Sequence, residues 1–206
     1  MPVENLEIHE ITRIDDSLLF PWLDLYELSF PPSEKALVST FLAVLNEGPR
    51  AAQRGVHLLA AVDSAGHLTG MAAHQDFQQH TAALLWYLAI VDGERAQGYG
   101  SWFYREIVES LDPSCRALFL EVEIPDLAAT SEARGLAERR IDFYRRLGAR
   151  VLRGIHYRQY VGDHVPPLPM HLMVHPVQPL DPTQAFDLAS RVFGPFIKKE
   201  ATLRLD

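Results

Sequence analysis

Residues 84–101 read LLWYLAIVDGERAQGYGS, and this stretch decides the fold. An apolar run from Ala82 to Val91 is followed by a short polar segment and then by Arg95-x-x-Gly98-x-Gly100. The pattern predicts a buried strand, a loop, and a helix that begins at Gly98 within this motif. Backbone amides at a helix N-terminus bind anions, and a pyrophosphate suits such a place. We therefore expect an anion-binding loop here.

The composition is that of a globular protein, with 48% hydrophobic and 22% charged residues among 206. The formal net charge of −8 argues against a nucleic-acid-binding surface, which needs a basic stripe, and favours a cationic substrate. The longest apolar run is too short to span a bilayer, and the first residues do not resemble a signal peptide. We expect a cytoplasmic protein that binds neither nucleic acid nor membrane.

The remaining periodicities predict an α/β chain of the α+β type. Three strands before the glycine loop indicate an antiparallel meander, whereas a doubly wound dinucleotide fold has its glycine loop after the first strand. The helix after the loop crosses to a parallel neighbour, so we expect a mixed, mostly antiparallel central sheet flanked by helices. Expected strands are 6–14, 57–62, 68–77, 82–91, 117–122, 150–161 and 170–174, and expected helices are 18–28, 37–45, 98–111, 136–147 and 182–193.

Three closely spaced prolines, Pro176, Pro179 and Pro182, indicate a linker after residue 175. We therefore expect one domain over residues 1–175 and a C-terminal extension with a short helix over residues 176–206. The extension helix could dock on its own domain or on a second subunit, which leaves a homodimer open.

Four motifs occur in order: Tyr87–Asp92 (YLAIVD), Arg95–Gly100 (RAQGYG), Leu120–Val122 (LEV) and Phe143–Gly148 (FYRRLG). Together they resemble the GCN5-related N-acetyltransferase (GNAT) family. The resemblance implies a GNAT-like fold and acetyl-CoA as co-substrate. It implies transfer of the acetyl group to a primary amine by direct attack in a ternary complex. The acceptor would be a small molecule or a peptide, and the acidic charge favours a cationic one.

The resemblance also assigns cofactor-binding positions. In the family, loop amides hold the CoA pyrophosphate, and a strand edge pairs with the pantetheine arm as an added strand would. The matching residues here are Leu88, Ala89, Ile90, Arg95, Ala96, Gln97, Gly98, Tyr99, Gly100, Ser101 and Asp126. Asp126 stands where many relatives have an asparagine, and its carboxylate cannot donate as the amide does. Residues 127–138 are an insertion relative to the family pattern, and we expect them to form either a helix extension or a flap.

Tyr144 is the candidate general acid, because the tyrosine at this family position protonates the departing CoA thiolate. The alternative is a core tyrosine, since Ile141, Tyr144 and Leu147 recur at helical spacing.

Glu121 is the candidate general base that removes a proton from the acceptor amine. It interrupts an apolar strand, and strand alternation places Glu123 on the same face, where two carboxylates would raise one pKa. The alternatives are Glu123 or a water as the base, or a glutamate paired with one of the nearby arginines, Arg139, Arg140 or Arg145.

The nine histidines show no metal-binding motif. The closest pairs are His74 with His80 and His171 with His175. Residues 171 and 175 of a predicted strand share a face but lie too far apart for one ion, and no His-Glu-x-x-His or cysteine cluster occurs, so we expect no metal site. Two other functions stay open. One is a GNAT-fold acyl-CoA-binding or regulatory module without turnover, and the other is a protein that binds a different phosphate ligand.

Overall fold

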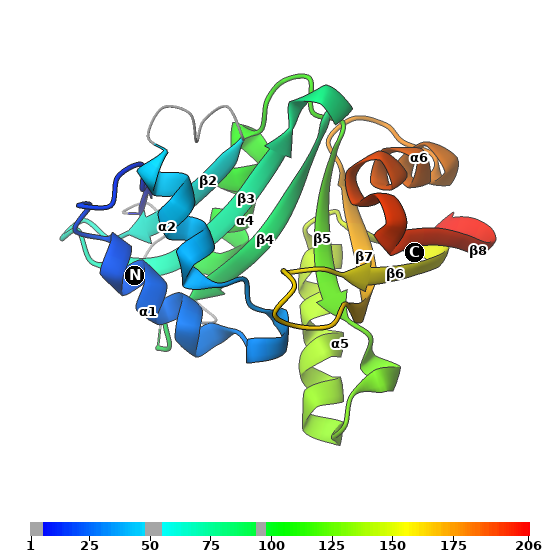
Figure 1. Cartoon of the computed structure of the whole chain (residues 1–206), viewed down its shortest axis with the longest axis horizontal. Coiled ribbons are helices and arrows are strands. Elements are labelled where there is room, and N and C mark those ends of the chain that lie inside the picture. Colours follow the sequence, from blue (N-terminus) through cyan, green and yellow to red (C-terminus); the bar gives the residue numbers. More distant parts are fainter. Residues whose placement is uncertain (1–5, 48–54, 94–97) are drawn as a thin grey trace. The chain divides into compact units, whose positions relative to one another are not determined.

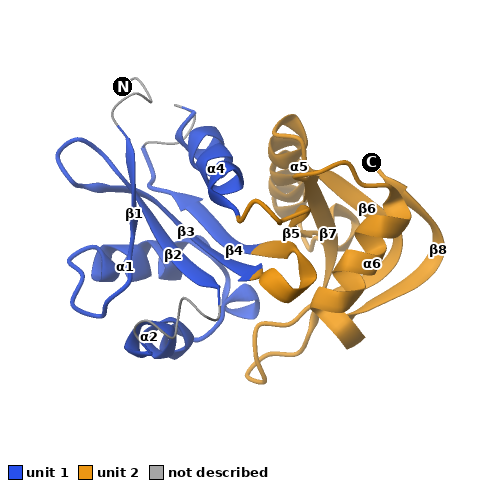
Figure 2. Ribbon diagram, turned by 90° about the horizontal axis from the view of Figure 1, so that it is seen from above, with its two compact units in different colours: residues 1–76, 85–111 blue, residues 77–84, 112–206 orange. Residues whose placement is uncertain are grey.

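The computed structural model describes residues 6–47, 55–93 and 98–206. Its fold is α+β, a mostly antiparallel sheet flanked by helices, as the sequence predicts (Figure 1). The sheet has eight strands within these residues, one more than expected. The chain divides into two compact units (Figure 2). Unit 1 comprises Met1–Asp76 and Leu85–Leu111, and unit 2 comprises Phe77–Leu84 and Asp112–Asp206. The predicted boundary after residue 175 thus falls inside unit 2.

Unit 1 is built on neighbouring strands in the order β1-β2-β3-β4. Strands β1 and β2 pair antiparallel, as do β2 and β3. The first two helices of the unit lie on one face of these strands, and α4 lies on the other (Figures 1 and 2). The elements are β1 (Glu7–Glu10), α1 (Leu19–Ser29), η2 (Pro32–Glu34), α2 (Val38–Asn46), β2 (Val56–Val62), β3 (Leu68–Phe77), β4 (Ala82–Ile90) and α4 (Tyr99–Ser110).

An aromatic cluster fills the core of unit 1. Trp22 and Tyr26 of α1 pack on Phe41 of α2, and Tyr87 of β4 meets the Tyr26 ring edge-on with centroids 4.8 Å apart. The Tyr87 hydroxyl also accepts a hydrogen bond from the Ala36 amide at 2.9 Å. Edge-on aromatic pairs add about 0.5–1.5 kcal/mol beyond their buried area. The cluster therefore fixes the α1–α2 connection against the strand that leads into the glycine loop.

Unit 2 carries strands in the order β5-β7-β6-β8, and the pairings between these neighbours are antiparallel. Phe193 at the end of α6 packs edge-on against Phe119 of β5 and Tyr157 of β6, with centroids 5.5 and 5.0 Å apart. The elements are η3 (Gln78–His80), β5 (Ala117–Glu123), η4 (Pro125–Leu127), α5 (Ser131–Arg146), β6 (Arg150–Gln159), β7 (Leu168–Pro176), α6 (Pro182–Phe193), η5 (Gly194–Phe196) and β8 (Ile197–Leu205).

Helix α5 begins earlier than the sequence pattern predicts. The expected start was Leu136, but the Thr130 side chain accepts a hydrogen bond from the Ala133 amide at 3.1 Å and caps a helix that begins at Ser131. Most of the segment that interrupts the family pattern is therefore a helix extension. None of the helices within the described ranges is long and apolar enough to cross a bilayer.

Strand β8 was not expected. It contains the charged run Lys198-Lys199-Glu200, which breaks the apolar pattern. The strand pairs with β6 and is mostly exposed. Charged side chains are common on edge strands because they discourage pairing with other chains. The tail beyond α6 thus continues the strands of unit 2.

Candidate active site

The predicted site residues fall into two sets, one in each unit, and the first set includes the start of α4. Gly98 caps this helix with φ 87°, a left-handed conformation that favours glycine. Its carbonyl accepts a hydrogen bond from the Trp102 amide at 3.0 Å. Tyr99 is buried, and Gly100 and Ser101 are partly buried. A helix N-terminus with no side chain on its cap suits close approach of an anionic group.

The second part of this set is the end of β4. Ala89 and Ile90 are buried and Leu88 is partly buried. Gly70 on β3 lies so close that a Cβ there would stand 2.7 Å from Ile90 Cδ1 and 3.0 Å from the Ala89 carbonyl oxygen. Glycine at this position therefore permits the close packing of this end of β4. Three further cofactor-binding predictions, Arg95, Ala96 and Gln97, lie outside the described residues.

The second set of predicted site residues lies in unit 2 and includes Glu121 of β5. Its Oε1 accepts a hydrogen bond from the Tyr157 hydroxyl, and its Oε2 accepts one from Gln159 Nε2 at 2.9 Å. Both donors stand on β6 and are neutral. Burial raises the pKa of the Glu121 carboxyl, and the Tyr157 and Gln159 hydrogen bonds lower it by less. The expected cause, a neighbouring carboxylate, is not what raises it.

Glu123, two residues further along β5, has a different environment. Its carboxylate forms an ion pair with the Arg140 guanidinium of α5 at 2.5 Å. The other oxygen, Oε2, is buried and has no hydrogen-bond partner. One of the three candidate arginines therefore pairs with Glu123, while Glu121 is held by neutral groups.

Tyr144 lies on the buried side of α5 and is 7% exposed. The Phe143 ring packs edge-on against it, with centroids 5.0 Å apart. Burial raises the pKa of the Tyr144 phenol to about 12, although the Arg140 charge lowers it. The phenol is therefore protonated throughout the physiological range and can act as a proton donor.

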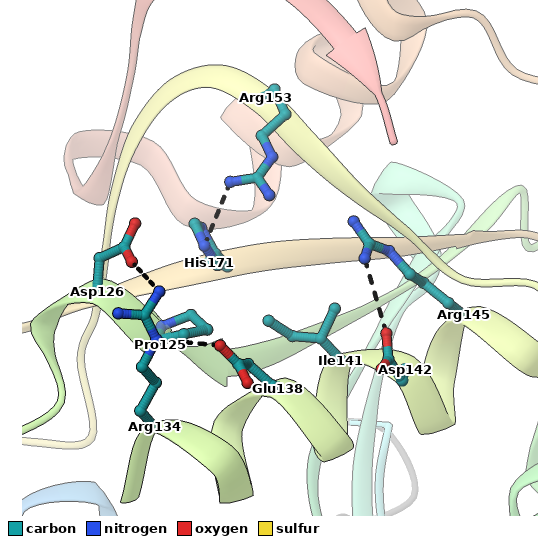
Figure 3. A pocket seen from close by; sticks show the side chains of 9 residues that line it. All are labelled: Pro125, Asp126, Arg134, Glu138, Ile141, Asp142, Arg145, Arg153 and His171. Atoms are coloured by element: carbon teal, nitrogen blue, oxygen red, sulfur yellow. Dashed lines mark hydrogen bonds and ion pairs between the residues drawn. The ribbon is translucent and has the colours of Figure 1, made fainter. Parts of the chain in front are cut away.

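Asp126 lies on the wall of a cavity of about 360 Å³ in unit 2 (Figure 3). Its carboxylate pairs with Arg134 Nη2 at 2.9 Å, and Arg134 Nε also pairs with Glu138 at 3.0 Å. Across the cavity, Arg153 Nη1 lies 3.3 Å from His171 Nε2. Burial first, and Arg153 second, lower the pKa of His171 to about 4, so this histidine is neutral.

The charges of this cavity largely balance. Three arginines face three carboxylates there, since Asp142 joins the two named above and lies 3.8 Å from Arg145 Nη1. A cavity without net charge gives a phosphate little electrostatic preference. The predicted contact of Asp126 with CoA stays a prediction.

Sequence reasoning did not find the partners of Glu121. Tyr157 and Gln159 stand 36 and 38 residues from it, and only the strand order brings them together. A contact between two histidines was also missed. His74 faces His57, its partner in the antiparallel register of β2 and β3. A prediction of the β2–β3 hairpin register could have found this pair.

Comparisons by sequence find neither a matching protein-family model nor a matching curated protein. Comparisons by structure do find similar proteins. A protein from Bacteroides thetaiotaomicron, described as an acetyltransferase of the GNAT family, superposes with a TM-score of 0.69 and 25% sequence identity. The match covers 91% of this chain and 98% of that one.

Two further solved structures share the fold at lower identity. One is an acetyltransferase from Salmonella typhimurium with acetyl-CoA bound, with a TM-score of 0.57, 12% identity, and coverage of 86% of this chain and 96% of that one. The other is the dodecameric spermidine N-acetyltransferase of Vibrio cholerae, also with a TM-score of 0.57 and 12% identity, covering 84% and 95%. The chain therefore has the fold of the GCN5-related N-acetyltransferases.

Proposed function

We propose that this protein transfers the acetyl group of acetyl-CoA to a primary amine. The observation that carries the proposal is the Glu121 carboxyl. In a GNAT fold it lies partly buried on β5, and only neutral hydrogen-bond donors hold it. Such a carboxyl can gain a proton without leaving a buried cation unpaired. Its raised pKa suits a base that works near neutral pH.

The proposed reaction needs three proton transfers. The acceptor amine is an ammonium at neutral pH and gains a lone pair only when it loses a proton, which Glu121 accepts and later passes to solvent. The amine nitrogen then attacks the thioester carbonyl, and the C–S bond breaks as the tetrahedral intermediate collapses. Tyr144 donates its phenol proton to the departing thiolate, and the second proton that the nitrogen loses on forming the amide restores the Tyr144 phenol through water. Backbone amides near Leu88–Ile90 would polarise the carbonyl, and one fixed donor of this kind contributes roughly 3 kcal/mol.

The cofactor would bind along unit 1. The start of α4, from Gly98 to Ser101, supplies the helix N-terminus for the pyrophosphate, together with the preceding loop. The end of β4 would hold the pantetheine arm by backbone hydrogen bonds. The acetyl-CoA bound to the similar Salmonella typhimurium structure supports this assignment.

The acceptor we propose is a cationic amine, either a small molecule or the amino group of a peptide. The net charge of −8 supports this class, because an acidic protein attracts cations. The similar spermidine N-acetyltransferase gives a precedent for a polyamine acceptor. The assembly of that protein also makes a homo-oligomer a reasonable proposal here.

The first test measures CoA binding and then turnover. Acetyl-CoA should raise the melting temperature, since a ligand that binds only the native state stabilises it by mass action. The protein should then release free CoA thiol only when an amine is present, and faster with spermidine or a basic peptide than with neutral amines. CoA binding without thiol release for any amine would instead indicate a non-catalytic acyl-CoA-binding module. Binding of other nucleotides but not of CoA would refute the whole assignment.

The second test compares two neighbouring carboxylates. Glu121→Gln should lower kcat by about 10²–10⁴-fold, the usual contribution of a general base. Glu123→Gln is the matched control on the same strand, because it keeps the shape of the side chain. It weakens the ion pair with Arg140 and removes a small electrostatic effect on the Tyr144 pKa. If Glu123→Gln abolishes turnover and Glu121→Gln does not, the roles of the two glutamates are reversed.

A further inference from the structure

Three side chains of unit 1 gather at the β2–β3 pair, and none of them is assigned to acetyl transfer. They are His57 on β2 and His74 and Asp76 on β3. The antiparallel register sets His57 opposite His74, and their rings stack with centroids 4.6 Å apart. One nitrogen or oxygen from each of the three lies within 4.8 Å of the others. This spacing is that of side chains that can share one metal ion.

The distances within the cluster match a coordination shell. His57 Nε2 lies 3.6 Å from Asp76 Oδ2, and His74 Nε2 lies 3.6 Å from Asp76 Oδ1. These separations are too long for hydrogen bonds. Two ligands of a tetrahedral zinc ion, each about 2.0–2.1 Å from the metal, stand about 3.3 Å apart. The two imidazole rings are stacked with an interplanar angle of 14°, so one ring must turn about its side-chain bonds before both nitrogens point at one ion.

Two buried atoms of the cluster have no hydrogen-bond partner. They are His74 Nδ1 and Asp76 Oδ1. His74 is 4% exposed, so solvent does not compensate for the lack. A buried polar atom without a partner costs about 1–3 kcal/mol. Asp76 Oδ1, which lies 3.6 Å from His74 Nε2, is the one of the two that faces the cluster, and a cation bound there would satisfy it.

A fourth residue orients one of the histidines. Glu10 Oε1 on β1 lies 2.8 Å from His57 Nδ1, so that Nδ1 donates a proton to the carboxylate and Nε2 faces Asp76. Histidines that bind metals commonly donate their second ring nitrogen to a carboxylate in this way. The backbone also holds Asp76 in place, because its amide donates to the Gly55 carbonyl at 2.7 Å.

We propose that His57, His74 and Asp76 bind one divalent transition-metal ion, Zn²⁺ in particular, with Glu10 as the orienting partner of His57. Two imidazoles and one carboxylate form a donor set that suits zinc, and the fourth coordination position is left for a water or another exchangeable ligand. The site belongs to the β2–β3 pair and does not depend on the proposed acetyl transfer.

The test is direct metal binding by the whole chain with any affinity tag removed. The protein is stripped with a chelator and titrated with Zn²⁺ against a chromophoric competitor, and bound metal is counted by mass spectrometry after dialysis. We expect one equivalent. His57→Gln and Asp76→Asn should each weaken binding at least tenfold, and Glu10→Gln should weaken it by about 10–100-fold, as loss of an orienting partner does.

The matched control is His67→Gln. His67 also stands in unit 1 beside an aspartate, with Nδ1 3.4 Å from Asp63 Oδ2, but it is exposed and belongs to no group of three. This variant should bind zinc as the wild type does. Co²⁺ binding with the visible absorption of a tetrahedral complex, lost in Asp76→Asn, would add support. No zinc retained by the folded wild type, or equal loss in His57→Gln and His67→Gln, would overturn the proposal.

Discussion

Replacing Tyr157 with phenylalanine should shift the pH dependence of the reaction rather than abolish it. The Tyr157 hydroxyl donates a hydrogen bond to Glu121, and this bond lowers the pKa of the carboxyl against the larger effect of burial. The variant removes that donor and keeps the ring, so the edge-on contact with Phe193 at 5.0 Å survives. The pKa of Glu121 must then rise.

The expected size of the shift follows from the hydrogen bond. A hydrogen bond to a charged group contributes about 1.5–3 kcal/mol, and 1.36 kcal/mol corresponds to one pKa unit. A base acts only when deprotonated, so a higher pKa moves the acidic limb of the kcat/KM profile upward by about 1–2 pH units. Activity should fall at low pH and recover at high pH.

The assay is thiol release across pH 5–9 with amine well below KM, which gives kcat/KM, for wild type, Tyr157→Phe and Tyr160→Phe. Tyr160 is the matched control, because its exposed hydroxyl donates to Asp163 at 2.7 Å instead of Glu121. Its removal should leave the acidic limb in place. An unshifted limb in Tyr157→Phe, with only a lower plateau, would refute the assignment of Glu121 as the base.

Three further predictions concern other residues. Tyr144→Phe should lower kcat by about 10²–10⁴-fold with little change in KM for acetyl-CoA, since a general acid contributes to the chemical step. The acidic limb of the pH profile should stay in place, and full activity of the variant would exclude the role of Tyr144 as the acid. Gly98→Ala should cost about 1–2 kcal/mol in urea unfolding and weaken CoA binding, whereas Gly66→Ala, at a similar φ of 80° in an open turn, should cost stability alone. Equal CoA affinity in both variants would contradict the anion-site assignment. Thr130→Ala removes the cap of α5 and should lower the free energy of unfolding, measured in urea, by about 1 kcal/mol. An unchanged free energy of unfolding would contradict the capping role of Thr130.

Local patterns predicted most of the fold. The expected strand at residues 68–77 has the observed bounds of β3, because a turn precedes it and a polar run follows it. The helix at 98–111 differs from α4 by one residue at each end, since Gly98 and Asp112-Pro113 mark its limits in the sequence. These element boundaries depend on residues that are adjacent in the sequence, so they can be predicted from the sequence alone.

Features that depend on distant residues were not predicted. Strand β8 has little apolar pattern of its own, and it forms because β6 offers it hydrogen bonds. The motif identified Glu121 but not what surrounds it, because Tyr157 and Gln159 reach it only through the order β5-β7-β6. His57 and His74 meet through the register of a hairpin, although they stand 17 positions apart in the printed sequence.

The two glutamates of β5 show how such distant contacts divide chemical roles. Both stand on the same face of one strand, and the sequence alone does not separate them. Glu123 forms an ion pair with the Arg140 guanidinium, a partner that stabilises only the charged carboxylate. Glu121 faces a phenol and an amide, and the Gln159 Oε1 atom is buried without a partner. If Glu121 gains a proton, the Gln159 amide can rotate so that Oε1 accepts it in a hydrogen bond, and the protonated state is then satisfied as well. Of the two carboxyls, only Glu121 therefore has partners suited to both of its charge states, which is what a general base requires.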